Sequence, residues 1–256
     1  MKLINLNIWG GRGGKEKLLK FFDQQRNKAD IFCLQEVWSA PYLHLENISA
    51  GGKKISHKEV MAYALQEIGA VLTGYIPFFV SNFEENFGLL IFTRKNIEIL
   101  GEGQLFVHKD KGFMPEGDIG HHARSIQYQT IKINGKPLTI INFHGLWNGK
   151  GKADSADRLM QSGKIISFIG TIDTPVILAG DFNLLPDTES LKKIENAGLK
   201  NLIREYGITS TRPSFYTKPE KFADYVLVSP EVRVKGFKAL EDEISDHLPL
   251  ELDFEL

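Results

Sequence analysis

Two polar side chains follow one strongly apolar stretch of the chain. Residues 176–181 read Val-Ile-Leu-Ala-Gly-Asp and continue into Phe182 and Asn183. A short run of β-branched and apolar residues is typical of a buried strand, and residues two apart on an extended chain point to the same face. Asp181 and Asn183 would then project together, a carboxylate beside an amide. The alternative is an Asx turn after the strand, in which Asn183 bonds to its own backbone.

Polar side chains end or interrupt several other apolar runs in a similar way. Together with the first pair, the set is Asn7, Glu36, His144, Asp181, Asn183, Asp224, Asp246 and His247. Strand ends from distant parts of a chain converge at one edge of a sheet in α/β proteins, and ligand sites form there. We therefore expect these residues to form one site.

The residue types in this set indicate metal-assisted hydrolysis. Glu36 has apolar neighbours, and burying an ionised carboxylate without a partner is very costly, which favours a bound cation. Carboxylate and amide oxygens without a cysteine cluster favour Mg²⁺, or Mn²⁺ in its place. Such an ion with histidines and spare carboxylates fits phosphoester hydrolysis. Serine and thiol nucleophiles have little support, because Gly-x-Ser-x-Gly is absent and the one cysteine, Cys33, lies in an apolar run.

Length and composition bound the remaining possibilities. The chain has 256 residues, of which 42% are hydrophobic, and no repeat or linker divides it, so we expect a single domain over residues 1–256. The net charge of −1 provides no overall basic field to capture nucleic acid. A single cysteine indicates a reducing, cytoplasmic location. No apolar run is long enough for a membrane span, and no obligate protein partner is evident.

Several further residues have both a functional and a structural interpretation. Arg124 opens a predicted strand over 123–132 and could face a phosphate, although a salt bridge at a sheet edge is about as plausible. Trp147 lies in the loop after His144 and is a candidate for contacting substrate. Arg158 and Gln161 lie three apart on a predicted helix and could reach the site, but a surface role is at least as plausible.

Two further segments carry residue types that occur in ligand sites. The adjacent His121 and His122 are expected to be surface residues, as such pairs usually are. Residues 209–222 interleave aromatic and basic side chains, including Arg212 and Tyr216. This composition suits a nucleotide or a phosphate-bearing ligand, although a packed loop would have the same composition.

Six short motifs resemble those of the endonuclease/exonuclease/phosphatase superfamily. They are Leu6-Asn7-Ile8-Trp9-Gly10, Leu34-Gln35-Glu36-Val37, Asn142-Phe143-His144, Gly180-Asp181-Phe182-Asn183, Ala223-Asp224-Tyr225 and Ser245-Asp246-His247-x-Pro249. Their order and spacing match over nearly the whole chain. The resemblance implies a four-layer α/β sandwich, in which two mostly antiparallel sheets pack face to face with helices outside.

The resemblance also implies a role for each polar residue in the middle of the site. Glu36 is similar to the principal metal ligand of the family, and Asp246 and Asn7 would complete or support the metal site. Asp181 resembles the residue that activates the attacking water. Asn183 resembles the residue that holds this water or the phosphate.

The histidines carry the remaining implied roles and bear on the substrate. His247 matches the phosphate-contacting histidine, with Asp224 as its carboxylate partner. His144 stands where pancreatic-type DNases and sphingomyelinases carry His and abasic-site endonucleases carry Tyr. Residues 6–10 with Glu-Val-Trp-Ser resemble the neutral sphingomyelinase branch, whereas Arg158-x-x-Gln161 resembles the branch that cleaves tyrosyl-DNA links.

The leading hypothesis from the sequence is therefore a nuclease-like, Mg²⁺-dependent phosphodiester hydrolase. Its partner would be a phosphoester substrate, with nucleic acid among the candidates. A sphingomyelinase-like or small-molecule phosphoesterase is one alternative. A non-catalytic binding module that retains the fold is the other.

Overall fold

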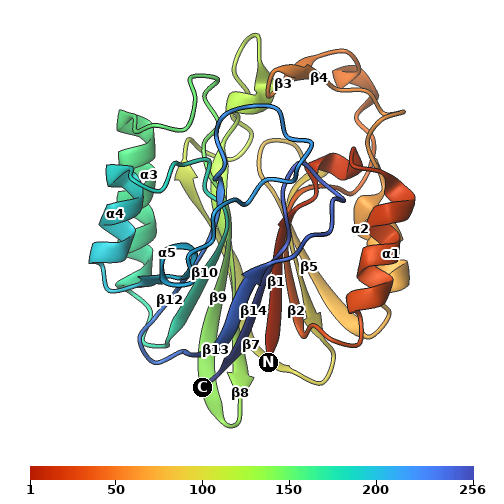
Figure 1. Ribbon diagram of the computed structural model, residues 1–256. Helices are drawn as coiled ribbons and strands as arrows, with labels where there is room; N and C mark the ends of the chain where they lie inside the picture. Colours follow the sequence, from red (N-terminus) through yellow and green to blue (C-terminus); the bar gives the residue numbers. More distant parts are fainter.

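Two six-stranded sheets pack face to face between two groups of helices (Figure 1). The computed structural model describes residues 1–256. The first sheet, in spatial order, consists of β13 (Arg233–Ala239), β14 (Leu250–Glu255), β1 (Lys2–Asn7), β2 (Ile31–Trp38), β6 (Phe87–Arg94) and β5 (Tyr75–Ser81). The second consists of β11 (Lys200–Asn201), β12 (Asp224–Val228), β10 (Val176–Asp181), β9 (Lys136–His144), β8 (Arg124–Ile133) and β7 (Glu98–His108).

Helices cover the outer face of each sheet. Those outside the first sheet are α1 (Lys15–Gln25) and α2 (Ala64–Val71), and those outside the second are α3 (Ala156–Ile169), α4 (Glu189–Asn196) and α5 (Leu202–Glu205) (Figure 1). Most strand pairs are antiparallel, and the pairs β1–β2 and β9–β10 are parallel. The expected α/β sandwich of four layers is confirmed. None of the helices combines the length and apolar character that a membrane crossing requires.

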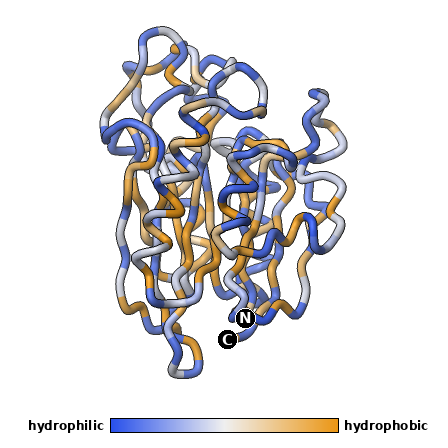
Figure 2. The backbone as a smooth tube through the Cα atoms, turned by 90° about the vertical axis from the view of Figure 1, so that its left-hand side faces the viewer, coloured by the Kyte–Doolittle hydropathy of each residue, from blue (hydrophilic) through white to orange (hydrophobic).

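Short elements connect these layers at the end of the sandwich where the loops are longest. They are the 3₁₀ helices η1 (Trp9–Gly11), η2 (Leu43–Leu45) and η3 (Ile119–His121), and the small hairpin of β3 (Ser49–Ala50) and β4 (Lys53–Lys54). Hydrophobic residues concentrate along the central strands, whereas hydrophilic stretches dominate the loops (Figure 2).

The central strands are buried on both faces. Leu3 of β1 and Cys33 of β2 pack in the core between the sheets, whereas Ile4 and Phe32 belong to the core beneath α1 and α2. This alternation follows from the two-residue period of a strand. Strand β1 ends at Asn7, and Trp9, which has a positive φ of 52°, begins η1.

A polar layer joins the two sheets directly beneath the ends of the strands. The Gln35 amide donates to Asn5 Oδ1 at 2.9 Å and to Asn142 Oδ1 at 2.7 Å. The Asn142 amide in turn donates to Gln127 Oε1 at 3.0 Å. Because buried amides need their partners, this network fixes the position of β1 and β2 relative to β8 and β9. It therefore positions the residues that follow at the strand ends.

Helix α4 shows how distant residues complete a local element. Its own N-cap residue, Thr188, makes no side-chain capping bond. Instead, Asp154 accepts from the backbone N–H groups of Glu189 at 2.7 Å and Ser190 at 2.9 Å. Asp154 thus satisfies two of the free N–H groups at the start of the helix.

We expect Asp154→Ala to lower the free energy of unfolding by about 1 kcal/mol at pH 7, the usual cost of losing an N-cap. Burial raises the pKa of Asp154, but its bonds to the Ser190 hydroxyl and to the two N–H groups outweigh burial and leave the pKa lowered. Its contribution is therefore present above the ordinary value of 3.8 and is lost as the pH falls through the folded value. Urea unfolding should show the difference from wild type at pH 7 and a smaller one near pH 3. The exposed Asp173→Ala is the control; an equal loss in both variants would contradict the capping role.

Candidate active site

Strand pairing places three polar residues side by side at one edge of the second sheet. Asp181, at the end of β10, pairs with His144 at the end of the parallel strand β9. It also pairs with Asp224 at the start of the antiparallel strand β12. Asn7 ends β1 of the facing sheet, at the same edge of the sandwich. The structure therefore brings residues from the whole length of the chain to one place.

The Asn7 amide links the two sheets at this edge. Its Nδ2 donates to Glu36 Oε1 at 3.1 Å and to Asp181 Oδ2 at 3.0 Å. Its Oδ1 accepts from the backbone N–H of Trp9 at 2.9 Å. Every polar atom of the Asn7 side chain is thus occupied within the protein, and Glu36 and Asp181 lie next to each other.

Glu36 reaches the site because of an irregularity in β2. The pairing of β2 with β6 shifts its register between Leu34 and Val37, and Glu36 has a positive φ of 57°. A bulge with a residue in the left-handed region turns that residue out of the regular ladder. Burial and the neighbouring Asp246 carboxylate raise the pKa of Glu36. The negative charges of Glu36 and Asp246 therefore repel each other within the site.

Asp181 is the most fully bonded carboxylate of the group. Its Oδ1 accepts from the backbone N–H of Asn183 at 2.9 Å, and Oδ2 lies 3.4 Å from the Asn183 amide. Strand β10 ends at Asp181, and Asn183 has a positive φ of 53°. An Asx turn is therefore present, but Asp181 provides its acceptor, and both side chains still face the site. Burial raises the pKa of Asp181, but nearby positive groups, His247 first, outweigh it and lower the pKa.

His247 lies between three carboxylates. Its Nδ1 is 2.8 Å from both oxygens of Asp224, and its Nε2 is 3.6 Å from Asp181 Oδ2 and 3.7 Å from Asp246 Oδ1. Burial and the Arg212 guanidinium lower the pKa of His247, but the three carboxylates together outweigh them and raise it. The ring is therefore held as a cation, with Nδ1–H donating to Asp224 and Nε2–H facing the site.

The ring of His144 is neutral, in contrast to that of His247. Its Nδ1 lies 3.3 Å from Arg124 Nη1, and the same Nη1 is 3.0 Å from His122 Nε2. His122 Nδ1 donates to the Ala123 carbonyl at 2.6 Å, so its Nε2 must accept. Burial, and then the charge of Arg124, lower the pKa of His144 to about 3. A neutral His144 that accepts at Nδ1 carries its hydrogen on Nε2, which lies 3.6 Å from Asp181 Oδ2.

The structural alternative for Arg124 and the expected surface position of His122 were both wrong. Arg124 forms no salt bridge at a sheet edge: it is 2% exposed and donates to two histidines and to the Gly120 carbonyl. His122 is not a surface residue, because only 3% of it is exposed. A buried arginine provides the reason, since its guanidinium needs acceptors that the adjacent chain supplies.

Arg158 and Gln161 are also buried rather than at the surface. Arg158 donates to the backbone carbonyls of Leu146, Gly151 and Ala153, and Gln161 accepts from the backbone N–H of Leu146 at 3.2 Å. These bonds hold the loop over residues 145–153. Trp147 lies in this loop and lines the same cavity as Asp181 and His247, whereas neither Arg158 nor Gln161 lines it.

Asp246 provides the clearest indication of a cation site. Arg212 Nη1 donates to its backbone oxygen at 2.7 Å and to Oδ2 at 3.1 Å. Its Oδ1 is buried and has no hydrogen-bond partner. An orphaned carboxylate oxygen close to Glu36, whose pKa this charge raises, fits a hard divalent ion.

A second grouping of ligand atoms is also close enough to hold an ion. Oxygens of Asp181 and Asp224 and a nitrogen of His247 lie within 4.8 Å of one another. The two short bonds from Asp224 to His247 already occupy atoms of this group. The Glu36 side chain is 24% exposed, against 3% for Asp181, so Glu36 and Asp246 offer the more accessible oxygens.

A cavity of about 600 Å³ opens above these residues. It is lined by the site side chains, by all three tryptophans of the chain, and by cationic side chains. Among the latter are Arg12, Lys53 and Lys152, and burial lowers the pKa of Lys152 to about 8. Arg12 and Lys53 were not predicted as site residues, because Arg12 directly follows η1 and Lys53 belongs to the short strand β4, and only the fold brings both to the cavity.

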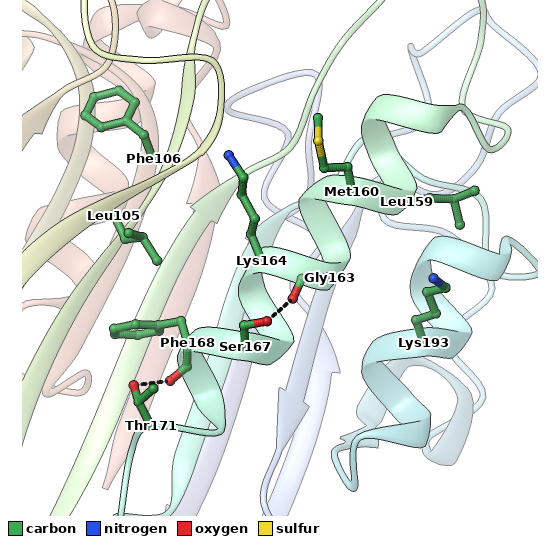
Figure 3. Close-up of a pocket in the computed structure, with 10 residues that line it drawn as sticks. All are labelled: Leu105, Phe106, Leu159, Met160, Gly163, Lys164, Ser167, Phe168, Thr171 and Lys193. Carbon is green, nitrogen blue, oxygen red and sulfur yellow. Dashed lines mark hydrogen bonds between the residues drawn. The ribbon is translucent and has the colours of Figure 1, made fainter.

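A larger hollow of about 880 Å³ lies elsewhere, between β7 and α3 and beside α4 (Figure 3). Its lining residues include neither a carboxylate nor a histidine. Its two hydroxyls bond to nearby carbonyls, Ser167 to Gly163 at 3.0 Å and Thr171 to Phe168 at 2.7 Å. This surface lacks the groups that hydrolysis requires, and the chemistry belongs to the smaller cavity.

Comparisons with known proteins agree with the fold and the motifs. The chain resembles a mannosyl-6-phosphatase from Bacteroides thetaiotaomicron, with 19% identity over 100% of both chains and a TM-score of 0.75. It also resembles D. rerio TDP2 in complex with a single-strand DNA product, with 18% identity over 100% of this chain and 99% of that chain and a TM-score of 0.69. A search of curated proteins gave no match.

The family comparison covers most of the sequence. The model of the Endonuclease/Exonuclease/phosphatase family matches residues 4–247, which include all the polar residues that meet at the cavity. The solved structures above, at under 25% identity, show the shared fold. The chain therefore belongs to the Endonuclease/Exonuclease/phosphatase family and is a phosphoester-hydrolysing enzyme.

Proposed function

We propose that the protein is a Mg²⁺-dependent phosphoester hydrolase in which water activated by Asp181 attacks the phosphorus in line. One observation carries this proposal: Nε2 of His144 and Nε2 of His247 each lie 3.6 Å from the same oxygen of Asp181. The N–H group of a protonated imidazole and that of a neutral imidazole thus flank one ionised carboxylate. An oxyanion bound between them would lie next to the base.

Glu36 and Asp246 are the residues that we propose hold the ion. Asn7 supports them, because its amide nitrogen faces Glu36 while its oxygen is occupied by the backbone. When bound, the ion would withdraw charge from the phosphate and ease the ionisation of water. Mn²⁺ has a similar preference for oxygen ligands and would replace Mg²⁺ in an assay.

The side chains around the proposed metal site would have the remaining catalytic roles. Asp181 is ionised and accepts the proton of the attacking water, and the Asn183 amide, at 3.4 Å, holds this water or a phosphate oxygen. The cationic His247 and the neutral His144 donate their Nε2–H groups to nonbridging oxygens. Asp224 holds the ring of His247 in place through Nδ1.

Arg124 acts in this scheme as a positioning residue for His144. We expect Arg124→Lys to lower kcat about 10- to 100-fold with little change in KM, because hydrogen bonds to charged groups contribute about 1.5–3 kcal/mol. A lysine ammonium cannot bridge His122 and His144 as the planar guanidinium does. Nitrogen chemical shifts of His144 should show the Nε2–H form in wild type and a mixture in the variant. Unchanged shifts and kcat would rule this role out; Arg204→Lys, at an exposed ion pair, is the control.

A substrate panel separates the proposed hydrolase from its alternatives. It should include p-nitrophenyl phosphate, bis-p-nitrophenyl phosphate, sphingomyelin and single-stranded DNA, each with Mg²⁺, with Mn²⁺ and with chelator. We expect metal-dependent hydrolysis of at least one of them. No hydrolysis, together with no Mn²⁺ binding by calorimetry, would instead favour a binding module that retains the fold.

A further inference from the structure

Two loops from opposite halves of the molecule meet above the cavity. Asp118 accepts from the backbone N–H groups of Gly51 at 2.7 Å and Gly52 at 2.9 Å, and also from Gly120 at 2.8 Å. Residues 49–54 follow β2 of the first sheet, whereas residues 118–121 precede β8 of the second. We call these two segments together the clasp. In Figure 1 the β3–β4 hairpin lies beside the loop that carries η3.

The contact within the clasp is close. A Cβ atom on Gly120 would lie 2.4 Å from the Gly51 nitrogen, which is shorter than real Cβ contacts. Only glycine at position 120 therefore allows the hairpin to approach this far. Three backbone N–H groups donate to the Asp118 carboxylate, and the backbones of Gly51 and Gly120 are in close contact. The two segments of the clasp are therefore held together by specific interactions.

Both halves of the clasp line the cavity above the site. Gly51, Gly52 and Lys53 contribute from the hairpin, and Ile119 and Gly120 from the facing loop. The clasp thus forms a wall that runs from one half of the molecule to the other. A cavity of about 600 Å³ is within the range that holds a small ligand.

The space beside the clasp suits the organic part of a compact ligand. Lys53 Nζ lies 4.1 Å from the ring centre of Trp9, and the rings of His121 and Trp147 are 5.2 Å apart. Aromatic faces with a cation at one edge offer both apolar and polar contacts. A nucleic-acid strand, in contrast, needs an open groove that tracks its backbone.

We propose that the clasp restricts the site to compact phosphoesters, whose phosphate contacts His144 and His247 and whose remaining part lies beside the clasp. A polynucleotide strand is excluded, because the clasp blocks its path across the strand ends. This inference rests on the proposed hydrolase function and specifies the substrate class of the same site.

The test opens the clasp and compares two substrates. Wild type, Asp118→Ala and Gly120→Ala are assayed with p-nitrophenyl phosphate and with a single-stranded DNA oligonucleotide in Mg²⁺. We expect wild type to prefer the small ester by at least 100-fold in kcat/KM. Both variants should reduce this preference about tenfold or more, through a higher KM for the small ester and no loss on the oligonucleotide. Asp110→Ala, in an exposed part of the same connection, should behave as wild type.

Two results would overturn the inference while leaving the hydrolase intact. One is efficient cleavage of the oligonucleotide by wild type. The other is an unchanged substrate preference in Asp118→Ala and Gly120→Ala when their melting temperatures equal that of wild type. Melting temperatures also identify a variant that fails to fold, in which case the second variant decides.

A binding measurement tests the clasp even if no ester is hydrolysed. All three tryptophans line the cavity, so their fluorescence reports its occupancy. We expect glucose 6-phosphate and inorganic phosphate to change the emission of wild type saturably, with weaker binding in Asp118→Ala and no response to the oligonucleotide. Tighter binding of the oligonucleotide, or no response to either small phosphate, would overturn the inference independently of catalysis.

Discussion

Asp181→Asn should reduce kcat about 100- to 10,000-fold on whichever phosphoester the enzyme hydrolyses, the range expected for a lost general base. Asparagine keeps the shape and can retain a bond to the Asn183 N–H, but it cannot accept a proton from water. The neighbouring His247 also loses one of the carboxylates that raise its pKa. Initial rates at saturating and subsaturating substrate should show the loss mainly in kcat.

The stability of this variant separates a chemical loss from a structural one. Two imidazoles and two amides surround the Asp181 carboxylate. Its replacement by a neutral amide should leave unfolding cooperative, with a melting temperature near that of wild type. Asp187→Asn is the matched control, because the Asp187 side chain is 89% exposed and lies in the loop that follows β10. Near-wild-type turnover in Asp181→Asn would remove the proposed base, whereas an equal loss in Asp187→Asn would make the assay uninformative about the site.

The sequence predicted the strand ends because their signal is local. Apolar runs with a two-residue period mark the strands, and each polar tip is visible as a break in its run. Asp181 and His144 meet because they end neighbouring parallel strands, and Asp224 joins them because an antiparallel strand starts where its neighbour ends. Chemical type and position at the ends of apolar strands were therefore enough to predict that these three residues converge.

Other features depend on contacts that no local pattern encodes. The bulge that turns Glu36 into the site depends on how β2 pairs with β6. The Asp154 cap of α4 joins segments 35 residues apart. His122 was expected at the surface but is buried against Arg124. The Asp118 clasp joins loops that belong to different sheets. For Asp154 and Asp118, a carboxylate accepts from backbone N–H groups that only the folded chain brings near.

Arg124 shows the same limit for a functional assignment. From the sequence it was a candidate phosphate ligand. In the structure its Nη1 and Nη2 already have acceptors in His122, His144 and Gly120. A role through His144 is the interpretation that these bonds support directly, while the buried Nε of Arg124 has no hydrogen-bond partner.

Glu36→Gln should weaken Mn²⁺ binding by more than the roughly 10- to 100-fold that loss of an outer-shell partner costs, and should lower activity with it. Glutamine removes the charge that the ion needs and keeps an oxygen and the side-chain length. It also relieves the repulsion with Asp246, which raises the pKa of Glu36 in the metal-free protein. The variant is therefore expected to be at least as stable as wild type without metal, and to gain less stability when metal is added.

Calorimetric titration and thermal melting, each with and without Mn²⁺, measure both effects without any substrate. Glu98→Gln, whose side chain is 60% exposed at a surface ion pair, is the control and should bind Mn²⁺ as wild type does. The alternative grouping of Asp181, Asp224 and His247 predicts the reverse outcome, with binding retained in Glu36→Gln and lost in Asp224→Asn. The two variants therefore decide which side of the cavity holds the ion. If neither loses affinity, the ion is not held by these carboxylates.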